Sequence, residues 1–188
     1  INSCMSLFRQ FRKPSGRKPV HAAPYSALAR YYNAVMSHVN YLEWAEYVLE
    51  LGSLHTPLIR NITDLACGTG TLSLHIARRG YSVTGIDGNR EMIEQARLNA
   101  SADSLDITYH VGDLTDPVPV KNQDMILCLY DSINYLMDEN QLGSFFRQAR
   151  NAIDSAGILI FDCSTEHNSL KHFNGFSDLD EYDNCLIS

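Results

Sequence analysis

Two glycines and several carboxylates stand at recurring places in this sequence, each directly after a strand-like segment. Glycine has no Cβ atom, so the backbone at such a position can turn sharply and approach a ligand closely. A carboxylate accepts hydrogen bonds from hydroxyl and amino groups, and it can also face a positive charge. The pattern therefore predicts a polar ligand site built from Gly68, Gly70, Asp87, Asp113 and Asp131.

Asp87 and Asp113 have the spacing expected for two parts of a nucleoside. Asp87 lies 19 residues after Gly68, where a carboxylate at a strand tip can accept both hydroxyl protons of a ribose. Asp113 could accept from an exocyclic amine while the next backbone N–H, that of Leu114, donates to a ring nitrogen, as an adenine edge requires. The alternatives are a helix N-cap for Asp87 and a simple turn residue for Asp113.

The charge of the predicted site indicates which nucleoside it would take. No Lys or Arg lies within the glycine turn 67–70 or directly beside Asp87, whereas a phosphate ligand would favour such residues or a strong helix N-terminus. Ser73 occupies the position of the third glycine in a dinucleotide turn. Asp131 could face an ammonium group, although an Asx turn is its alternative. These features favour S-adenosylmethionine, whose sulfonium and ammonium groups suit carboxylates and aromatic faces.

The hydrophobic periodicity predicts how these residues are positioned. Strands alternate with helices, which favours a Rossmann-like, doubly wound, mainly parallel sheet with helices on both faces, preceded by two N-terminal helices. Ligands bind at the carboxyl ends of such strands. The expected strands are 61–66, 81–86, 105–111, 123–129 and 157–162; the expected helices are 25–36, 40–51, 71–79, 90–100 and 138–153, with Asn40 and Asp138 as N-caps and Gly52 as a helix end.

Length and charge set the remaining bounds. With 188 residues and 45% hydrophobic residues the chain suits one domain at 21–188, and no apolar run is long enough to span a membrane. The first 42 residues hold six basic and no acidic residues, which predicts a flexible basic arm at 1–20. The acidic remainder disfavours broad nucleic-acid binding without excluding it. Five scattered cysteines favour a reduced, cytoplasmic protein, and no metal site is expected.

The sequence resembles the class I S-adenosylmethionine-dependent methyltransferases. DLACGTG at 64–70 is similar to their first motif, TGIDGNREMIEQAR at 84–97 to their second and VGDLTD at 111–116 to their third. The leading Tyr-rich segment with Trp44, together with CLYDSINY and LIFDCST, resembles a branch that acts on small molecules.

The resemblance implies cofactor roles for individual residues. The glycines would pass under the methionine portion, Asp64 would organise the turn or the ammonium, Asp87 would bind the ribose, and Asp113 with Leu114 would read the adenine. The aromatic residues would cover the cofactor, although a core role is an equal alternative for each. The implied set is Tyr25, Tyr32, Trp44, Asp64, Ala66, Gly68, Gly70, Asp87, Gly88, Met92, Asp113, Leu114 and Asp131.

The sequence departs from the family pattern at two places. Ala66 stands where many members have glycine, which leaves cofactor binding intact. Only 26 residues follow Asp162, so we expect the last strands of the family sheet to be missing, with 163–188 an incomplete C-terminal part. The fifth strand would then be an exposed edge through which a homodimer could form.

The expected reaction is in-line methyl transfer to a small acceptor that the sequence does not identify. No catalytic base is assigned, although Glu166, His167 and His172 follow the fifth strand. The alternatives are a truncated, non-catalytic binding module and an NAD-type oxidoreductase.

Overall fold

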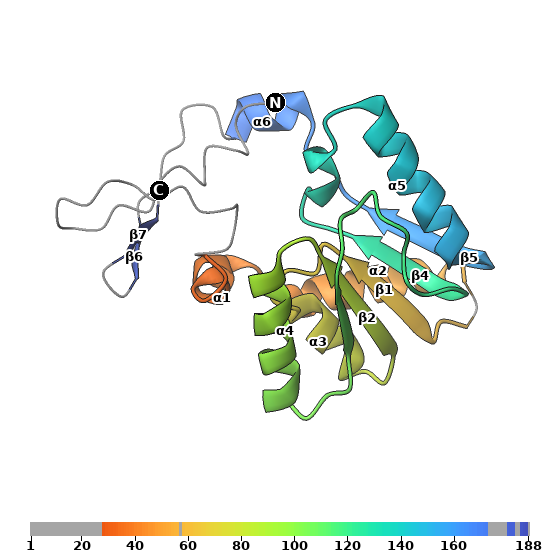
Figure 1. Cartoon of the computed structure of the whole chain (residues 1–188), viewed down its shortest axis with the longest axis horizontal. Coiled ribbons are helices and arrows are strands. Elements are labelled where there is room, and N and C mark those ends of the chain that lie inside the picture. The colour runs from red at the N-terminus through yellow and green to blue at the C-terminus, as the bar shows by residue number, and fades with distance from the viewer. Residues whose placement is uncertain (1–27, 57, 173–179, 183–184, 188) are drawn as a thin grey trace.

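A computed structural model of the chain describes residues 28–56, 58–172, 180–182 and 185–187. The arm expected at 1–20 and the candidate Tyr25 lie outside these residues. Within them the chain forms a five-stranded sheet flanked by helices, and the predicted doubly wound α/β fold is confirmed (Figure 1).

All five strands of the main sheet run parallel, in the order β3-β2-β1-β4-β5. The chain moves outward from β1 to β3, then crosses back and moves outward on the other side. The switch point therefore lies between β1 and β4, which is where open α/β sheets bind ligands. The strands are β1 (Asn61–Leu65), β2 (Ser82–Asp87), β3 (Thr108–Val111), β4 (Gln123–Cys128) and β5 (Ile153–Phe161), and a separate hairpin contains β6 (Asp180–Tyr182) and β7 (Cys185–Ile187).

Helices cover both faces of the sheet. Val48 of α2 and Ile76 of α3 pack with Ile62 on one face, where α4 also lies. Phe145 of α5 packs with Leu65 on the other face. The helices are α1 (Tyr32–Val35), α2 (Tyr41–Ser53), α3 (Thr71–Ala77), α4 (Arg90–Ala102), α5 (Glu139–Ala152) and α6 (Glu166–His172), with 3₁₀ turns η2 (Met36–His38) and η3 (Ser132–Tyr135).

Side-chain caps fix where the longer helices begin. Asn40 accepts the backbone N–H of Glu43, and Asp138 accepts two backbone N–H groups at the start of α5. Both predicted N-caps are confirmed. Asn89 caps α4 by accepting from the Met92 N–H, so the N-cap of that helix is not Asp87.

Several predicted boundaries were wrong, among them the start of the third strand, which is Thr108 and not residue 105. Residues 28–31 form a turn rather than part of a helix over 25–36. Helix α2 continues through Gly52, where a Cβ atom would lie 2.8 Å from the Met125 sulfur, so this glycine permits close packing rather than ending the helix. Strand β5 begins at Ile153, directly after α5, instead of at Gly157.

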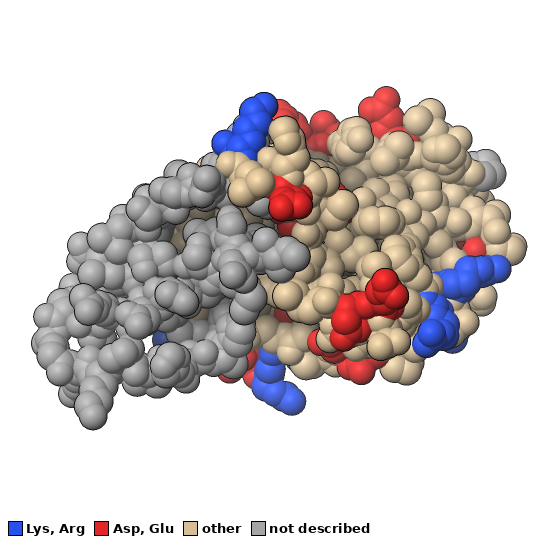
Figure 2. Space-filling model, turned by 90° about the horizontal axis from the view of Figure 1, so that it is seen from above, with Lys and Arg blue, Asp and Glu red and all other residues tan. Residues whose placement is uncertain are grey.

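Strand β5 ends the sheet among the described residues. On this side the rings of Phe146 and Phe161 meet edge to face with centroids 5.6 Å apart and remain partly exposed. Whether a second copy pairs here stays a prediction. None of the described helices has both the length and the apolar character needed to cross a bilayer. Seen from above, acidic side chains are spread over the described surface, and basic ones lie near its margins (Figure 2).

Candidate functional site: an acidic rim at the carboxyl ends of the strands

The turn between β1 and α3 is built from left-handed backbone positions. Ala66, Gly68 and Gly70 have φ angles of 58°, 55° and 77°. The turn is closed by two hydrogen bonds, from the Cys67 N–H to the Ile86 carbonyl and from the Gly70 N–H to the Cys67 carbonyl. Left-handed conformation costs an L-residue roughly 1–2 kcal/mol, so Ala66 carries strain that glycine would not.

Asp64 lies beneath this turn and is fully enclosed. Its Oδ2 atom accepts a 2.6 Å hydrogen bond from the Ser73 hydroxyl on α3, and the residue is only 3% exposed. Burial raises the pKa of Asp64 to about 7, Ser73 opposes that rise, and the negative charge of Asp87 adds to it. Asp64 is therefore tied to the helix that follows the turn, and its expected role in organising this loop stays a prediction.

Asp87 ties the tip of β2 to the glycine turn. Its Oδ2 accepts the Gly68 N–H at 2.8 Å, and its Oδ1 accepts the Asn89 N–H at 2.8 Å. A carboxylate offers about four acceptor positions, so both oxygens keep a lone pair for ribose hydroxyls. Burial raises the pKa of Asp87 despite these two N–H donors.

Helix α1 lies over the turn. The nearest atom to a Cβ built at Gly68 would be Cε1 of Tyr32, at 3.6 Å, so this aromatic ring covers the glycine. Burial, together with the charge of Asp87, raises the pKa of Tyr32 to about 12. The neighbouring Asn33 accepts a 2.5 Å hydrogen bond from the Thr69 hydroxyl. Sequence reasoning missed Asn33, because no spacing rule links it to a turn 36 residues further along the chain.

Trp44 belongs to an aromatic cluster with Tyr41 and Tyr130. Its ring centroid lies 5.4 Å from that of Tyr130, which lies 5.2 Å from Tyr41. Trp44 also packs against the core on the α2 side of the sheet. The structure thus gives Trp44 a core contact, while Tyr32 is the aromatic residue that meets the turn.

The chain after β4 brings two acids together. Tyr130 and Asp131 both have left-handed φ angles, 58° and 56°, and the Asp131 N–H donates to Oδ2 of Asp162 at 3.2 Å. Burial and then the Asp162 charge raise the pKa of Asp131. The Oδ1 atom of Asp162 is buried without a hydrogen-bond partner among the described residues. Sequence reasoning assigned Asp162 no role, although it follows β5 just as Asp131 follows β4.

The third motif forms a compact turn. Asp113 accepts from both the backbone N–H and the hydroxyl of Thr115, at 2.9 and 2.8 Å, and its own N–H donates to Asp116. This is the geometry of a simple turn residue, the alternative to an adenine contact. Both hydrogen bonds go to Oδ1, and Oδ2 of the exposed Asp113 accepts neither of them. Leu114 is half-buried and packs on the α5 side of the sheet.

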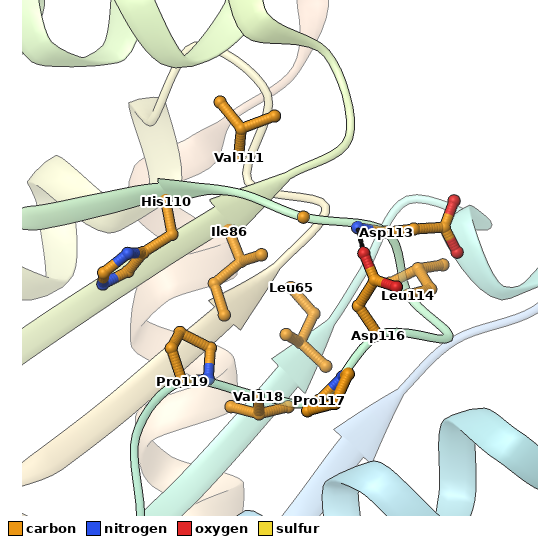
Figure 3. A pocket seen from close by; sticks show the side chains of 11 residues that line it. Leu65, Ile86, His110, Val111, Asp113, Leu114, Asp116, Pro117, Val118 and Pro119 are labelled. Atoms are coloured by element: carbon orange, nitrogen blue, oxygen red, sulfur yellow. Dashed lines mark hydrogen bonds between the residues drawn. The ribbon is translucent and has the colours of Figure 1, made fainter.

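A cavity of about 410 Å³ opens beside this motif (Figure 3). Its floor is apolar, and acidic residues stand at one end. No helix covers the sheet here, because residues 112–122 connect β3 to β4 as a loop. The cavity is lined by Leu65, Ile86, His110, Val111, Gly112, Asp113, Leu114, Asp116, Pro117, Val118 and Pro119.

The remaining candidates lie in different surroundings. Met92 is 2% exposed at the start of α4, whereas Gly88 is exposed. Glu166 and His167 are exposed on α6, and the side chain of His172 lies outside the described residues. Within the described ranges no three His, Cys, Asp or Glu side chains cluster as metal ligands would, and the expectation of no metal stays a prediction.

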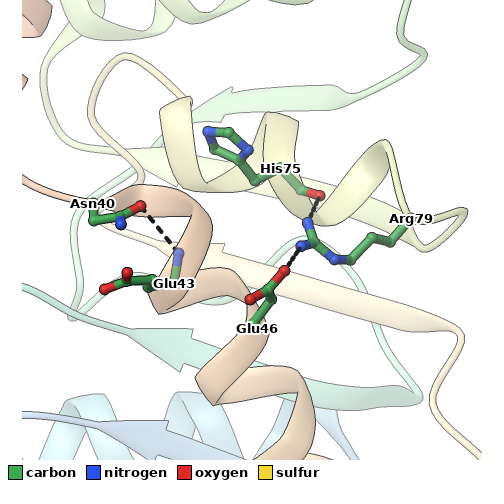
Figure 4. Close-up of polar contacts among 5 residues, drawn as sticks. All are labelled: Asn40, Glu43, Glu46, His75 and Arg79. Atoms are coloured by element: carbon green, nitrogen blue, oxygen red, sulfur yellow. Dashed lines mark hydrogen bonds and ion pairs between the residues drawn. The ribbon is translucent and has the colours of Figure 1, made fainter.

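Helices α2 and α3, which flank the aromatic cluster and the turn, are clamped together at the surface. Arg79 donates to Glu46 of α2 at 2.7 Å and to the His75 carbonyl at 2.9 Å (Figure 4). The contact links the segment just after α3 to α2, the helix that carries Trp44.

These features define an α/β domain with a glycine turn and several acids at the carboxyl ends of its parallel strands. Residues 62–157 match the family described as methyltransferase domain, and the chain belongs to that family. S-adenosylmethionine is its cofactor, and the alternative of an NAD-type oxidoreductase is set aside. The residues present fit S-adenosylmethionine. The space above Gly68 is open as far as the Tyr32 ring, both oxygens of Asp87 can accept further hydrogen bonds, and the side chains at the strand ends are acidic rather than basic.

Individual relatives agree with this assignment. The chain is 33% identical to the putative methyltransferase YqeM of Bacillus subtilis over 82% of its own length, and it spans 60% of that relative. A solved S-adenosylmethionine-dependent methyltransferase from Clostridium acetobutylicum has a TM-score of 0.70 at 23% identity, covering 86% of this chain and 65% of its own. The sugar N-methyltransferase KedS8 from Streptoalloteichus also has a TM-score of 0.70, at 21% identity and covering 92% and 68%.

Proposed function

We propose that the protein transfers a methyl group from S-adenosylmethionine to the nitrogen of a small amine. The observation that best supports this proposal is that two acids and a second tyrosine act on the hydroxyl of Tyr130. Burial raises the pKa of this phenol, and Asp64, Tyr32 and Asp162 each add to the rise. Asp64 on β1, Asp162 after β5 and Tyr32 over the glycine turn all act on this phenol. Tyr130 directly precedes Asp131 at the carboxyl edge of the sheet, and the Asp131 N–H donates to Asp162 at 3.2 Å.

The donor side of the site uses residues already tied to the glycine turn. Asp87 would hold the ribose hydroxyls, the turn 66–70 would pass beneath the methionine portion, and Asp113 with Leu114 would read the adenine. When bound, the cofactor supplies a methyl group on a positively charged sulfur atom. A ring of carboxyl groups and aromatic faces suits that charge.

The acceptor side would use Asp131 and Asp162. An amine approaches as an ammonium ion and must lose a proton before its nitrogen can attack. A carboxyl pair with one buried, unpartnered oxygen can hold the ammonium and take that proton. Holding both reactants in line contributes up to roughly 7–11 kcal/mol in ideal cases. The relative named as a sugar N-methyltransferase supports an amine acceptor.

A small acceptor also agrees with the surface. On the described face in Figure 2 the basic side chains form no continuous stripe or large patch, which nucleic-acid binding needs. A small-molecule acceptor, a cytoplasmic location and the absence of a nucleic-acid or membrane partner are parts of this proposal.

Methyl transfer to a panel of small amines, amino sugars included, tests the proposal directly. The chain is incubated with S-adenosylmethionine, and formation of S-adenosylhomocysteine and of the methylated product is followed by mass spectrometry. We expect turnover with at least one amine and none with the matching alcohol. Turnover confined to oxygen acceptors or RNA would contradict the amine. Cofactor binding without turnover on any acceptor class would favour the non-catalytic binding module.

A further inference from the structure

Three residues stand side by side across the sheet directly below the glycine turn. Asp64 on β1 pairs with Gly85 on β2, and Gly85 pairs with Tyr109 on β3. Residues paired in a parallel sheet point to the same face. Tyr109 therefore shares the face of Asp64 with only a glycine between them.

The ring of Tyr109 fills the space above that glycine. A Cβ atom built at Gly85 would lie 2.5 Å from both Cδ1 and Cε1 of Tyr109, closer than real contacts allow. Among the described residues the glycines with positive φ are Gly68, Gly70 and Gly80, so the φ angle of Gly85 is one that other residues adopt as well. Its lack of a side chain thus makes room for the ring and is not required by the backbone.

The far end of the ring reaches the cofactor turn. A Cβ atom built at Gly70 would collide with the Tyr109 hydroxyl and would lie 3.0 Å from Cζ of the ring. Tyr109 is 5% exposed, and burial raises its pKa, with the Cys67 thiol and Asp64 adding to the rise and Ser73 opposing it. The ring thus lies under Gly70 and beside the Ser73–Asp64 pair that holds the turn.

We propose that Tyr109 is a positioning residue for the methyl donor. Its ring crosses β2 over Gly85 and supports the turn 67–70 from the protein side. Gly70 is then a glycine partly because of Tyr109, in addition to the sharp turn and the close ligand approach that the sequence motif suggested. Tyr109 acts through the turn and touches no reacting atom. The inference rests on the donor site and not on the amine acceptor.

Calorimetric titration with S-adenosylhomocysteine tests this role without an acceptor. The variants are Tyr109→Leu, Tyr109→Phe and, as a matched control, Phe145→Leu. Phe145 is fully buried on the opposite face of the sheet. We expect both leucine variants to lose stability in urea, but only Tyr109→Leu to weaken binding, by tenfold or more. Tyr109→Phe should bind within threefold of wild type, because the hydroxyl makes no well-formed hydrogen bond.

Two results would overturn the role of Tyr109. Wild-type affinity in Tyr109→Leu would make the residue purely structural, and equal losses in Tyr109→Phe and Tyr109→Leu would assign the effect to the hydroxyl rather than the ring. A wild-type chain that binds no S-adenosylhomocysteine would instead remove the donor site itself, and this role with it.

A double-mutant cycle tests whether Gly85 affects cofactor binding through the Tyr109 ring. Gly85→Ala should weaken S-adenosylhomocysteine binding at least tenfold in the wild-type background, because the new methyl group displaces the ring. In the Tyr109→Ala background the same substitution should change the affinity by less than threefold. Equal effects in both backgrounds would show that Gly85 and Tyr109 act independently and would contradict the proposal.

Discussion

The carboxylate of Asp87 accepts the backbone N–H of Gly68 at 2.8 Å, which joins the tip of β2 to the glycine turn after β1. The same carboxylate accepts the Asn89 N–H at the start of α4. One acid thus sets the relative positions of two loops that lie 19 residues apart in the chain. A ligand that binds Asp87 is held against a turn that is already ordered.

Replacing Asp87 should weaken donor binding strongly. A hydrogen bond to a charged group contributes about 1.5–3 kcal/mol, and each 1.4 kcal/mol is tenfold in affinity. We expect Asp87→Ala to lower the affinity for S-adenosylhomocysteine at least tenfold in calorimetry. Asp103→Ala is the control, since that acid pairs with Arg78 at the exposed end of α4. Equal affinities for Asp87→Ala and wild type would remove the ribose assignment.

Asp64 should make stability fall as pH rises. Its pKa is raised to about 7 from 3.8, so between these values the folded state holds a proton that the unfolded state has lost. Each pKa unit corresponds to about 1.36 kcal/mol, which gives about 4 kcal/mol at most. Asp64→Asn cannot ionise and can still accept from Ser73.

Urea denaturation from pH 4 to pH 8 measures this effect. The free energy of unfolding of wild type should fall relative to that of Asp64→Asn as pH rises from 4 to about 7, and the difference should level off above that value. A difference that does not change with pH would show that Asp64 does not titrate in this range.

Ala66 should be replaceable by glycine with a gain in stability. Its φ of 58° is costly for alanine and accessible to glycine, so Ala66→Gly should raise the free energy of unfolding by about 1 kcal/mol. Ala100→Gly in the buried part of α4 is the matched control and should lower it by at least about 1 kcal/mol. A loss of stability in Ala66→Gly would contradict the strain at this position.

Removing the charge of Asp162 should make Asp131 easier to ionise. Burial is the larger cause of the raised Asp131 pKa, and the charge of Asp162 is the second. In Asp162→Asn the titration midpoint of the Asp131 carboxyl carbon, followed by NMR, should move to lower pH. It should remain above the ordinary aspartate value because burial persists. An unmoved midpoint would mean that the two acids do not interact.

The strand and helix order could be predicted because the hydrophobic period changes cleanly along this sequence. The N-caps Asn40 and Asp138 could also be predicted, since each side chain is a good hydrogen-bond acceptor directly before a helix. The ends of the helices and strands were harder to predict. Gly52 looks like a helix end in the sequence, but the sheet residue Met125 packs against it, and only the folded chain brings the two together.

The candidate site was predictable where a residue ends a strand and less so where it depends on contacts across the fold. Asp87 and Asp131 follow from their places at strand ends, and Asp64 follows from the resemblance of DLACGTG to the first motif of the family. Asn33 reaches the turn from α1, and Tyr109 reaches it from an edge strand. Neither residue has a sequence spacing that signals its contact.

The most direct measurement is a calorimetric titration of the wild-type chain with S-adenosylhomocysteine and, separately, with NADH. The acidic rim and the turn tied to Asp87 predict saturable binding of S-adenosylhomocysteine at one site and no heat with NADH. Binding of NADH alone, or of neither ligand, would contradict an acidic rim that binds the methyl donor.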